Sequence, residues 1–153
     1  MKTAYLAAGC FWGVQYKLDQ LAGVKSSEVG YMGGDTENPT YKDVCYLETG
    51  HAEVVKVTYD ETILSYAKLL EFFFSIHNPT TLNRQGPDVG TQYRSSIFTE
   101  DQNEKVIAQD QINKTEVLLN QKVVTQIEDK LNYYTAEEYH QKYLIKNPGQ
   151  CHI

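Results

Sequence analysis

The chain has 153 residues, with 14 Lys or Arg against 20 Asp or Glu, so its formal net charge is −6. This length suits a single domain spanning residues 1–153, with a core large enough to be stable. The acidic balance and the lack of a basic run argue against nucleic acid as a partner. No stretch approaches the run of about 18 apolar residues that a membrane helix needs, so we expect a cytoplasmic protein that binds no membrane.

Apolar periodicity and turn residues predict the elements in chain order. They are a strand at 3–8, a helix ending before Gly23, strands at 24–31 and 52–59, a helix at 66–77, a strand at 93–99, a helix at 101–119, a strand at 123–127 and a short helical segment at 136–144. Polar loops at 36–49 and 80–90 have the length of loops that build functional sites. The order predicts an α+β fold, a two-layer sandwich in which helices pack on a mixed, ferredoxin-like split βαβ sheet.

Three cysteines, Cys10, Cys45 and Cys151, lie too far apart for a C-x-x-C redox pair or a dense disulfide framework. A metal site would need them to converge with His152 without any local pair of ligands, and structural zinc sites usually supply such pairs. We therefore expect no metal and no cofactor. An odd number of cysteines in a reducing compartment points instead to thiol chemistry.

The segment GCFWG at residues 9–13 places Cys10 where an apolar strand gives way to a helical pattern. Backbone N–H groups at the first turn of a helix favour a thiolate, which is the reactive form of cysteine. Trp12, the single tryptophan, and two flanking glycines strengthen the reading of Cys10 as a nucleophile. The alternative is that Cys10 only packs, as buried cysteines often do.

Alternation along the strand at 52–59 puts Glu53 on the same, drier face as Val55 and Val57. Apolar surroundings favour the neutral form of a carboxyl group. A Glu beside a loop also commonly reaches solvent or an Arg, and both readings are open. His51 lies two residues away and brings a Cys–His pair into consideration, although we expect it to bond local backbone.

Three blocks occur in order along the chain: GCFWG at 9–13, TGHAEVV at 49–55, and NRQG at 83–86 continuing into DVGTQYRS at 88–95. On these blocks the chain resembles the A-type peptide-methionine sulfoxide reductases over nearly its full length. The resemblance implies reduction of the S epimer of methionine sulfoxide, in proteins or free, with thioredoxin as the reductant. It implies catalytic roles for Cys10 as nucleophile and Glu53 as acid, and substrate-binding roles for Phe11, Trp12, Tyr41, Asp88 and Tyr93.

In the implied reaction, Cys10 becomes a sulfenic acid that condenses with a second thiol. The candidate resolving thiol is Cys151, carried on a C-terminal tail at about 145–153. The chain ends without a second recycling cysteine, so we expect one Cys10–Cys151 disulfide that a partner reduces directly, in a monomer. Cys45 is expected to be a buried bystander.

Two other functions fit parts of the pattern. A cysteine hydrolase or acyltransferase would use Cys10 with His51 or His152, form an acyl-enzyme and need no reductant. A binding module would use Phe11 and Trp12 as an aromatic pocket for a methyl group and leave Cys10 inert.

Overall fold

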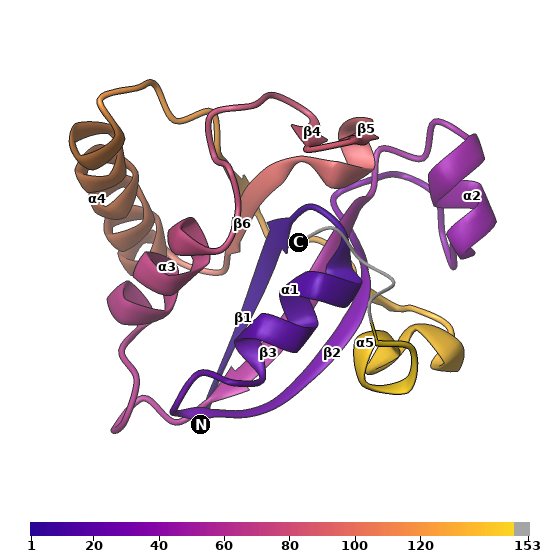
Figure 1. Ribbon diagram of the computed structural model, residues 1–153, viewed down its shortest axis with the longest axis horizontal. Helices are drawn as coiled ribbons and strands as arrows, with labels where there is room; N and C mark the ends of the chain where they lie inside the picture. Colours follow the sequence, from indigo (N-terminus) through magenta and orange to yellow (C-terminus); the bar gives the residue numbers. More distant parts are fainter. Residues whose placement is uncertain (149–153) are drawn as a thin grey trace.

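A computed structural model describes residues 1–148 of the chain (Figure 1). Its elements are β1 (Lys2–Ala8), α1 (Phe11–Leu18), β2 (Val24–Met32), α2 (Tyr41–Tyr46), β3 (Ala52–Tyr59), α3 (Tyr66–Ser75), β4 (Arg84–Gln85), β5 (Asp88–Val89), β6 (Ser95–Thr99), α4 (Gln102–Leu119), β7 (Gln126–Asp129), β8 (Tyr134–Thr135) and α5 (Tyr143–Lys146). Short 3-10 turns occupy Thr91–Tyr93 and Glu138–His140. Within the described part, no helix has the length and apolar character needed to cross a membrane.

Six strands form one mixed sheet in the order β7-β6-β1-β3-β2-β8. Strands β1 and β2 both run antiparallel to β3, which lies between them, and α1 connects them. The second unit is built the same way, with β3 and β6 on either side of β1 and α3 as their connection. These are two split βαβ units, and the predicted ferredoxin-like α+β sheet is confirmed. Strand β7 extends the sheet in parallel to β6.

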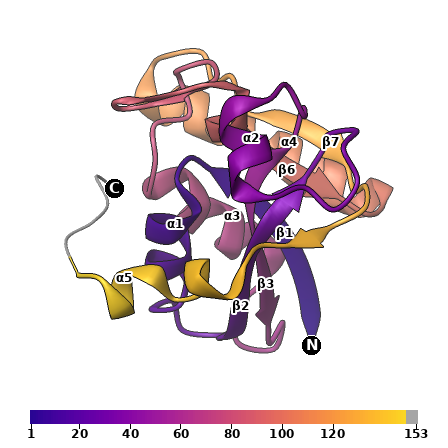
Figure 2. The same cartoon turned by 90° about the vertical axis from the view of Figure 1, so that its right-hand side faces the viewer.

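Strand β1 buries both of its faces. Along β1, Ala4, Leu6 and Ala8 join the large core under the helices, whereas Tyr5 and Ala7 face the opposite side. Figure 2 shows α1 and α3 together on one side of the strands. Because both faces of β1 are covered, its apolar residues form an almost continuous run in the sequence.

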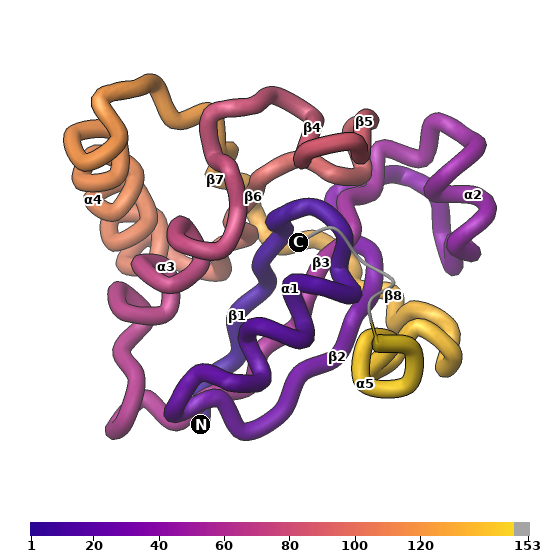
Figure 3. The backbone as a smooth tube through the Cα atoms, in the orientation of Figure 1, coloured from indigo at the N-terminus to yellow at the C-terminus, as the bar shows by residue number. Residues whose placement is uncertain are grey.

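The functional end of the sheet is the end at which α1 begins. Figure 3 shows α2 and the β4–β5 hairpin gathered around that end, and α5 lying beside α1. Both loops expected at 36–49 and 80–90 therefore contain short regular elements. Helix α2 begins with a capping box, in which the Thr40 side chain accepts from the Asp43 N–H and the Asp43 carboxylate accepts from the Thr40 N–H.

Several predicted boundaries were wrong for identifiable reasons. The strand expected at 123–127 begins only at Gln126, because the backbone N–H groups of Val123 and Val124 bond Glu116 and Pro79 instead of a strand. The helical segment expected at 136–144 is a 3-10 turn followed by α5. Gln141 interrupts it by bonding the N–H and the C=O of Val29 in β2, as a neighbouring strand would.

Candidate active site

Cys10 is the N-cap residue of α1, at the junction of β1 and the helix. Gly9 precedes it with φ of 98°, and a Cβ atom on Gly9 would lie 2.7 Å from Cγ of Gln85. Only glycine therefore lets the β4–β5 hairpin approach Cys10 this closely. The thiol thus lies at the N-terminal, positive end of the α1 dipole, which favours a thiolate there.

Glu53 lies on β3 with only 2% of its surface exposed. The predicted drier face is confirmed, since Val55, Val57 and Tyr59 on the same side are equally buried. The Oε1 atom of Glu53 accepts a 3.1 Å hydrogen bond from the backbone N–H of Phe11. The carboxyl group is thus fixed to the peptide unit that immediately follows Cys10.

Aromatic rings enclose the first turn of α1. Phe11 is 1% exposed, with its ring centroid 5.7 Å from that of Tyr31 and 6.3 Å from that of Tyr41. Trp12 stacks on Tyr143 of α5 with a centroid separation of 3.8 Å. The Trp12 indole N–H donates to Nδ1 of His140 over 2.9 Å, which fixes the plane of the indole.

One carboxylate that sequence reasoning missed orders this aromatic cluster. Glu137 accepts a 3.0 Å hydrogen bond from the Tyr31 hydroxyl and another 3.0 Å hydrogen bond from the backbone N–H of Tyr41. It therefore ties β2 to the start of α2. Nothing in the local sequence marks Glu137 or His140, because each acts on residues about a hundred positions earlier in the chain.

Tyr41 and Tyr93 are the two hydroxyl donors expected near the site. Burial raises the pKa of Tyr41, and Glu53 raises it further when its carboxyl group is ionised. The same two causes, in the same order, raise the pKa of Tyr93, with smaller contributions from Cys45, Asp88 and Cys10. Both hydroxyls consequently remain protonated at neutral pH.

Asp88 reaches the site from the β4–β5 hairpin. It lines a hollow of about 300 Å³ whose walls also include Cys10, Lys17, Ile76, His77, Gln85, Gly86 and Pro87. Lys17, His77 and Gln85 were not singled out from the sequence. The loop at 80–90 thus contributes directly to the surroundings of the thiol, as its length suggested.

His51 does not face a nucleophile. Its Nδ1 accepts from the Gly34 N–H at 3.0 Å, so its Nε2–H donates to the Thr36 carbonyl at 2.7 Å. Both ring nitrogens serve the backbone, as expected, and the Cys10–His51 hydrolase reading is not supported. Gly34 must be glycine here, because a Cβ would lie 2.2 Å from the Thr49 carbonyl oxygen.

The sequence has two further cysteines, Cys45 and Cys151. Cys45 is partly rather than fully buried, because α2 turns only Val44 inward, and its thiol bonds the side chain of Tyr41. Cys151 lies outside the described residues. Among residues 1–148, no group of three or more His, Cys, Asp or Glu side chains is placed to hold a metal ion.

A thiol at a helix start, tethered beside a buried carboxyl and near two protonated tyrosines, has the construction of an enzyme that attacks with sulfur and delivers a proton. Comparison with known proteins agrees. A family model described as peptide methionine sulfoxide reductase matches residues 2–153. The chain belongs to the peptide methionine sulfoxide reductase family.

The chain spans most of the length of the relatives that it matches. A peptide methionine sulfoxide reductase MsrA from Pelagibacter ubique is 54% identical over 146 residues, covering 95% of this chain and 99% of that protein. The MsrA of Clostridium perfringens strain 13 is 52% identical, covering 100% and 98%. Among solved structures, reduced Mxr1 from Saccharomyces cerevisiae has a TM-score of 0.94 at 38% identity, covering 99% of this chain and 88% of that one.

A second solved structure, methionine sulfoxide reductase A of Corynebacterium diphtheriae, has a TM-score of 0.87 at 37% identity, covering 98% of this chain and 77% of that one. The resemblance drawn from three short sequence blocks is confirmed. So is the enzyme class that it implied, a peptide methionine sulfoxide reductase of the A type.

Proposed function

We propose that Cys10 and Glu53 carry the reduction of the S epimer of methionine sulfoxide, both peptide-bound and free. The observation that carries this proposal is the 3.1 Å bond between Glu53 and the N–H of Phe11, because it holds a buried carboxyl next to the thiol at one helix start. A sulfoxide sulfur is a poor electrophile until its oxygen is protonated or strongly hydrogen-bonded. Thiol and acid must therefore act from one site.

In the first step the Cys10 sulfur attacks the sulfoxide sulfur while Glu53 delivers a proton to the oxygen. The attack forms a bond between the Cys10 sulfur and the methionine sulfur. The hydroxyl then passes from the methionine sulfur to the Cys10 sulfur as this sulfur–sulfur bond breaks, so methionine leaves and Cys10 becomes a sulfenic acid. Burial favours the protonated form of Glu53 before the reaction. Since Oε1 accepts from Phe11, the Oε2 atom is the one that would carry the proton.

Tyr41, Tyr93 and Asp88 would surround the sulfoxide oxygen, and Phe11 with Trp12 would receive the methyl group. Raised pKa values keep the two tyrosine hydroxyls as donors, which suits an oxygen that gains negative charge as its bond to sulfur weakens. Apolar contact with the methyl group orients the sulfur toward Cys10. The aromatic packing around Phe11 supports a wall that is rigid before substrate arrives.

In the second step the sulfenic acid would condense with the Cys151 thiol, releasing water and forming the Cys10–Cys151 disulfide. Helix α5 ends at Lys146 and packs beside α1, so Cys151 comes five positions after its end. An extended chain of five residues spans roughly 15 Å. A tail of that length, rooted beside the helix that carries Cys10, supports the assignment.

Thioredoxin is the proposed reductant of that disulfide. Mxr1 of Saccharomyces cerevisiae has been solved in complex with Trx2, with a TM-score of 0.66 to this chain at 26% identity, covering 93% of this chain and 84% of that one. We further propose a cytoplasmic monomer in which residues 1–153 form one domain. The reducing conditions of that compartment would keep all three thiols available.

The experiment uses the separated S and R epimers of N-acetyl-methionine sulfoxide with dithiothreitol as reductant. We expect methionine to form from the S epimer, and the Cys10→Ser variant to form none. The Cys45→Ser variant is the matched control and should retain activity. Equal use of both epimers, or undiminished activity without Cys10, would refute the proposal.

A further inference from the structure

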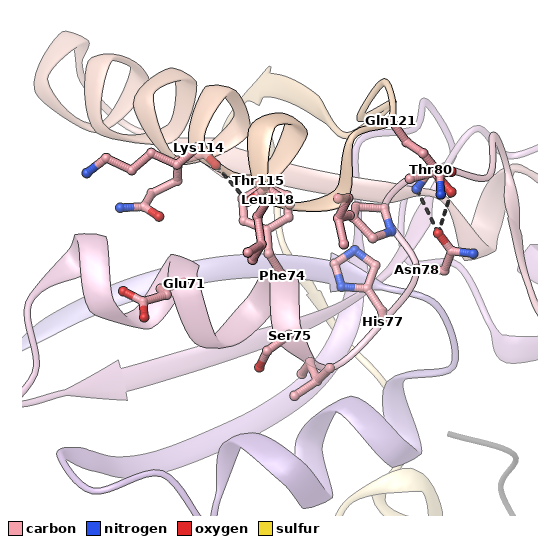
Figure 4. Close-up of a pocket in the computed structure, with 14 residues that line it drawn as sticks. Glu71, Phe74, Ser75, His77, Asn78, Thr80, Lys114, Thr115, Leu118 and Gln121 are labelled. Carbon is pink, nitrogen blue, oxygen red and sulfur yellow. Dashed lines mark hydrogen bonds between the residues drawn. The ribbon is translucent and has the colours of Figure 1, made fainter.

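A large hollow lies away from the aromatic cluster, between the C-terminal ends of α3 and α4. Its volume is about 930 Å³. Figure 4 shows Phe74 and His77 from one side facing Thr115 and Leu118 of α4, with Asn78 and Thr80 at one end. We call this hollow the α3–α4 groove. The proposed chemistry makes no use of it.

The α3–α4 groove meets the hollow that contains Cys10. Ile76 and His77 line both of them, so the two spaces share one boundary. His77 is held firmly in that boundary. Its Nδ1–H donates to the Phe73 carbonyl at 2.7 Å, and its Nε2 bonds the Ser95 hydroxyl at 2.7 Å. A substrate chain that extends from the Cys10 hollow to the groove would cross over Ile76 and His77.

The lining of the groove favours an uncharged, partly apolar occupant. Leu118 is 82% exposed at its edge, while Phe74 forms a buried part of its wall. The two charged groups at the groove are neutralised on their own helices, with Lys114 paired to Asp110 at 3.1 Å and Glu71 to Lys68 at 3.3 Å. No uncompensated charge among these residues would attract a phosphate or an acidic ligand.

We propose that the α3–α4 groove holds the polypeptide that flanks an oxidised methionine, on one side of it. The inference rests on the proposed function, because it takes Cys10 as the atom that attacks the sulfoxide. A methionine sulfoxide side chain in the Cys10 hollow leaves its main chain at the boundary formed by Ile76 and His77. The next residues then lie along the groove, with an apolar side chain against Phe74 and Leu118.

This arrangement has a directional consequence. Because the groove adjoins the Cys10 hollow at Ile76 and His77, residues added to one side of the methionine sulfoxide gain contacts there, and residues added to the other side do not. Free methionine sulfoxide gains none. The enzyme should therefore prefer peptides extended on one side, and the preference should depend on an apolar residue within that extension.

Leu118 and its neighbour Val117 allow a matched test. Val117 is 83% exposed, and of the two only Leu118 lines the groove. Leu118→Asp and Val117→Asp place the same charge at adjacent, solvent-exposed positions of α4, so both proteins should fold. Dithiothreitol serves as the reductant, which removes any effect on thioredoxin. The substrates are N-acetyl-methionine sulfoxide and two peptides that extend it by four residues, one toward each terminus, each with a leucine.

We expect one of the two peptides to have the higher kcat/KM with the wild-type enzyme. Leu118→Asp should lower that value about tenfold, as loss of one partly buried apolar contact does. Val117→Asp should leave it unchanged, and both variants should act normally on N-acetyl-methionine sulfoxide. Equal effects of the two variants, or an effect confined to assays with thioredoxin, would overturn the groove assignment. If the wild-type enzyme reduces no substrate, the proposed function itself fails.

Discussion

The backbone N–H of Phe11 and the Oε1 atom of Glu53 are joined across 42 positions of the chain by a buried 3.1 Å hydrogen bond. The bond connects the first residue of α1 to the second residue of β3. It makes the position of the carboxyl group depend on the same peptide unit that positions Cys10. Chemistry at the thiol and stability of the helix start are therefore coupled through Glu53.

Replacing Glu53 should separate these two effects. Glu53→Gln keeps an oxygen for the Phe11 N–H and an N–H donor for the sulfoxide, so we expect kcat to fall by roughly tenfold. Glu53→Ala removes both and should lower kcat by at least roughly a hundredfold. It also leaves a buried N–H unpaired, at a cost of about 1–3 kcal/mol. Steady-state rates and urea unfolding measure the two effects, and a Glu53→Ala variant as active as wild type would remove the acid role.

The resolving thiol can be tested by mass spectrometry after a single turnover. In Cys151→Ser, one equivalent of methionine should form, and the protein should become one oxygen atom heavier at Cys10. Turnover with thioredoxin should cease because no disulfide forms. Cys45→Ser serves as the control and should give the Cys10–Cys151 disulfide. A disulfide between Cys10 and Cys45 in the wild-type protein would contradict the assignment.

Local pattern was enough to find the parts of the site that lie on strongly periodic elements. Alternation along β3 placed Glu53 beside Val55 and Val57, because a strand with one drier face repeats every two residues. The strand-to-helix change at Cys10 was visible for the same reason. The surroundings of these residues can be inferred from the residues next to them in the sequence.

The missed parts depend on contacts between distant segments. Glu137 bonds Tyr31 and Tyr41 across 106 and 96 positions, and no neighbour of Glu137 signals either contact. His140 likewise accepts a hydrogen bond from Trp12, which lies 128 positions earlier in the chain. Strand β8 has only two residues, and its place in the sheet is set by pairing with β2 rather than by its own propensity.

A partly buried ion pair supports the turn that carries Tyr93. Arg94 donates through Nε to Glu128 of β7 at 3.0 Å and through Nη1 to the carbonyl of Thr91 at 3.0 Å. Glu128→Gln should leave the Arg94 guanidinium without its charge partner and lower the free energy of unfolding by about 3 kcal/mol. It should also lower kcat, because the Tyr93 hydroxyl loses its fixed position.

The neighbouring residue of β7 gives the control for Glu128. Asp129 pairs with Lys105 at 2.7 Å, but both side chains are largely exposed, at 74% and 40%. Asp129→Asn should therefore change the free energy of unfolding by less than about 1 kcal/mol and leave kcat unaltered. Urea titrations and initial rates of the two variants, run together, decide the point. Equal losses would show that burial of the Arg94 pair has no special role.

His77 should make the stability of the fold depend on pH. Burial lowers the pKa of His77 to about 4, from an ordinary value of 6.5. Below pH 6.5 the unfolded chain takes up a proton that the folded chain does not accept until about pH 4. The unfolded state is then favoured progressively, so stability present above pH 6.5 is lost as the pH falls toward 4, by about 3 kcal/mol in all.

The hydrogen-bond partners of His77 favour a neutral imidazole ring. Its Nδ1–H is used by the Phe73 carbonyl, and its Nε2 must accept from Ser95, whose own oxygen can in turn accept from Thr125 at 2.7 Å. Protonating Nε2 would force the Ser95 and Thr125 hydroxyls to reverse their hydrogen bonds and would place a charge in largely apolar surroundings. His77→Gln, which cannot titrate, should flatten the decline in unfolding free energy between pH 6.5 and 4. A decline as steep as in the wild-type protein would assign the pH dependence to the carboxyl groups instead.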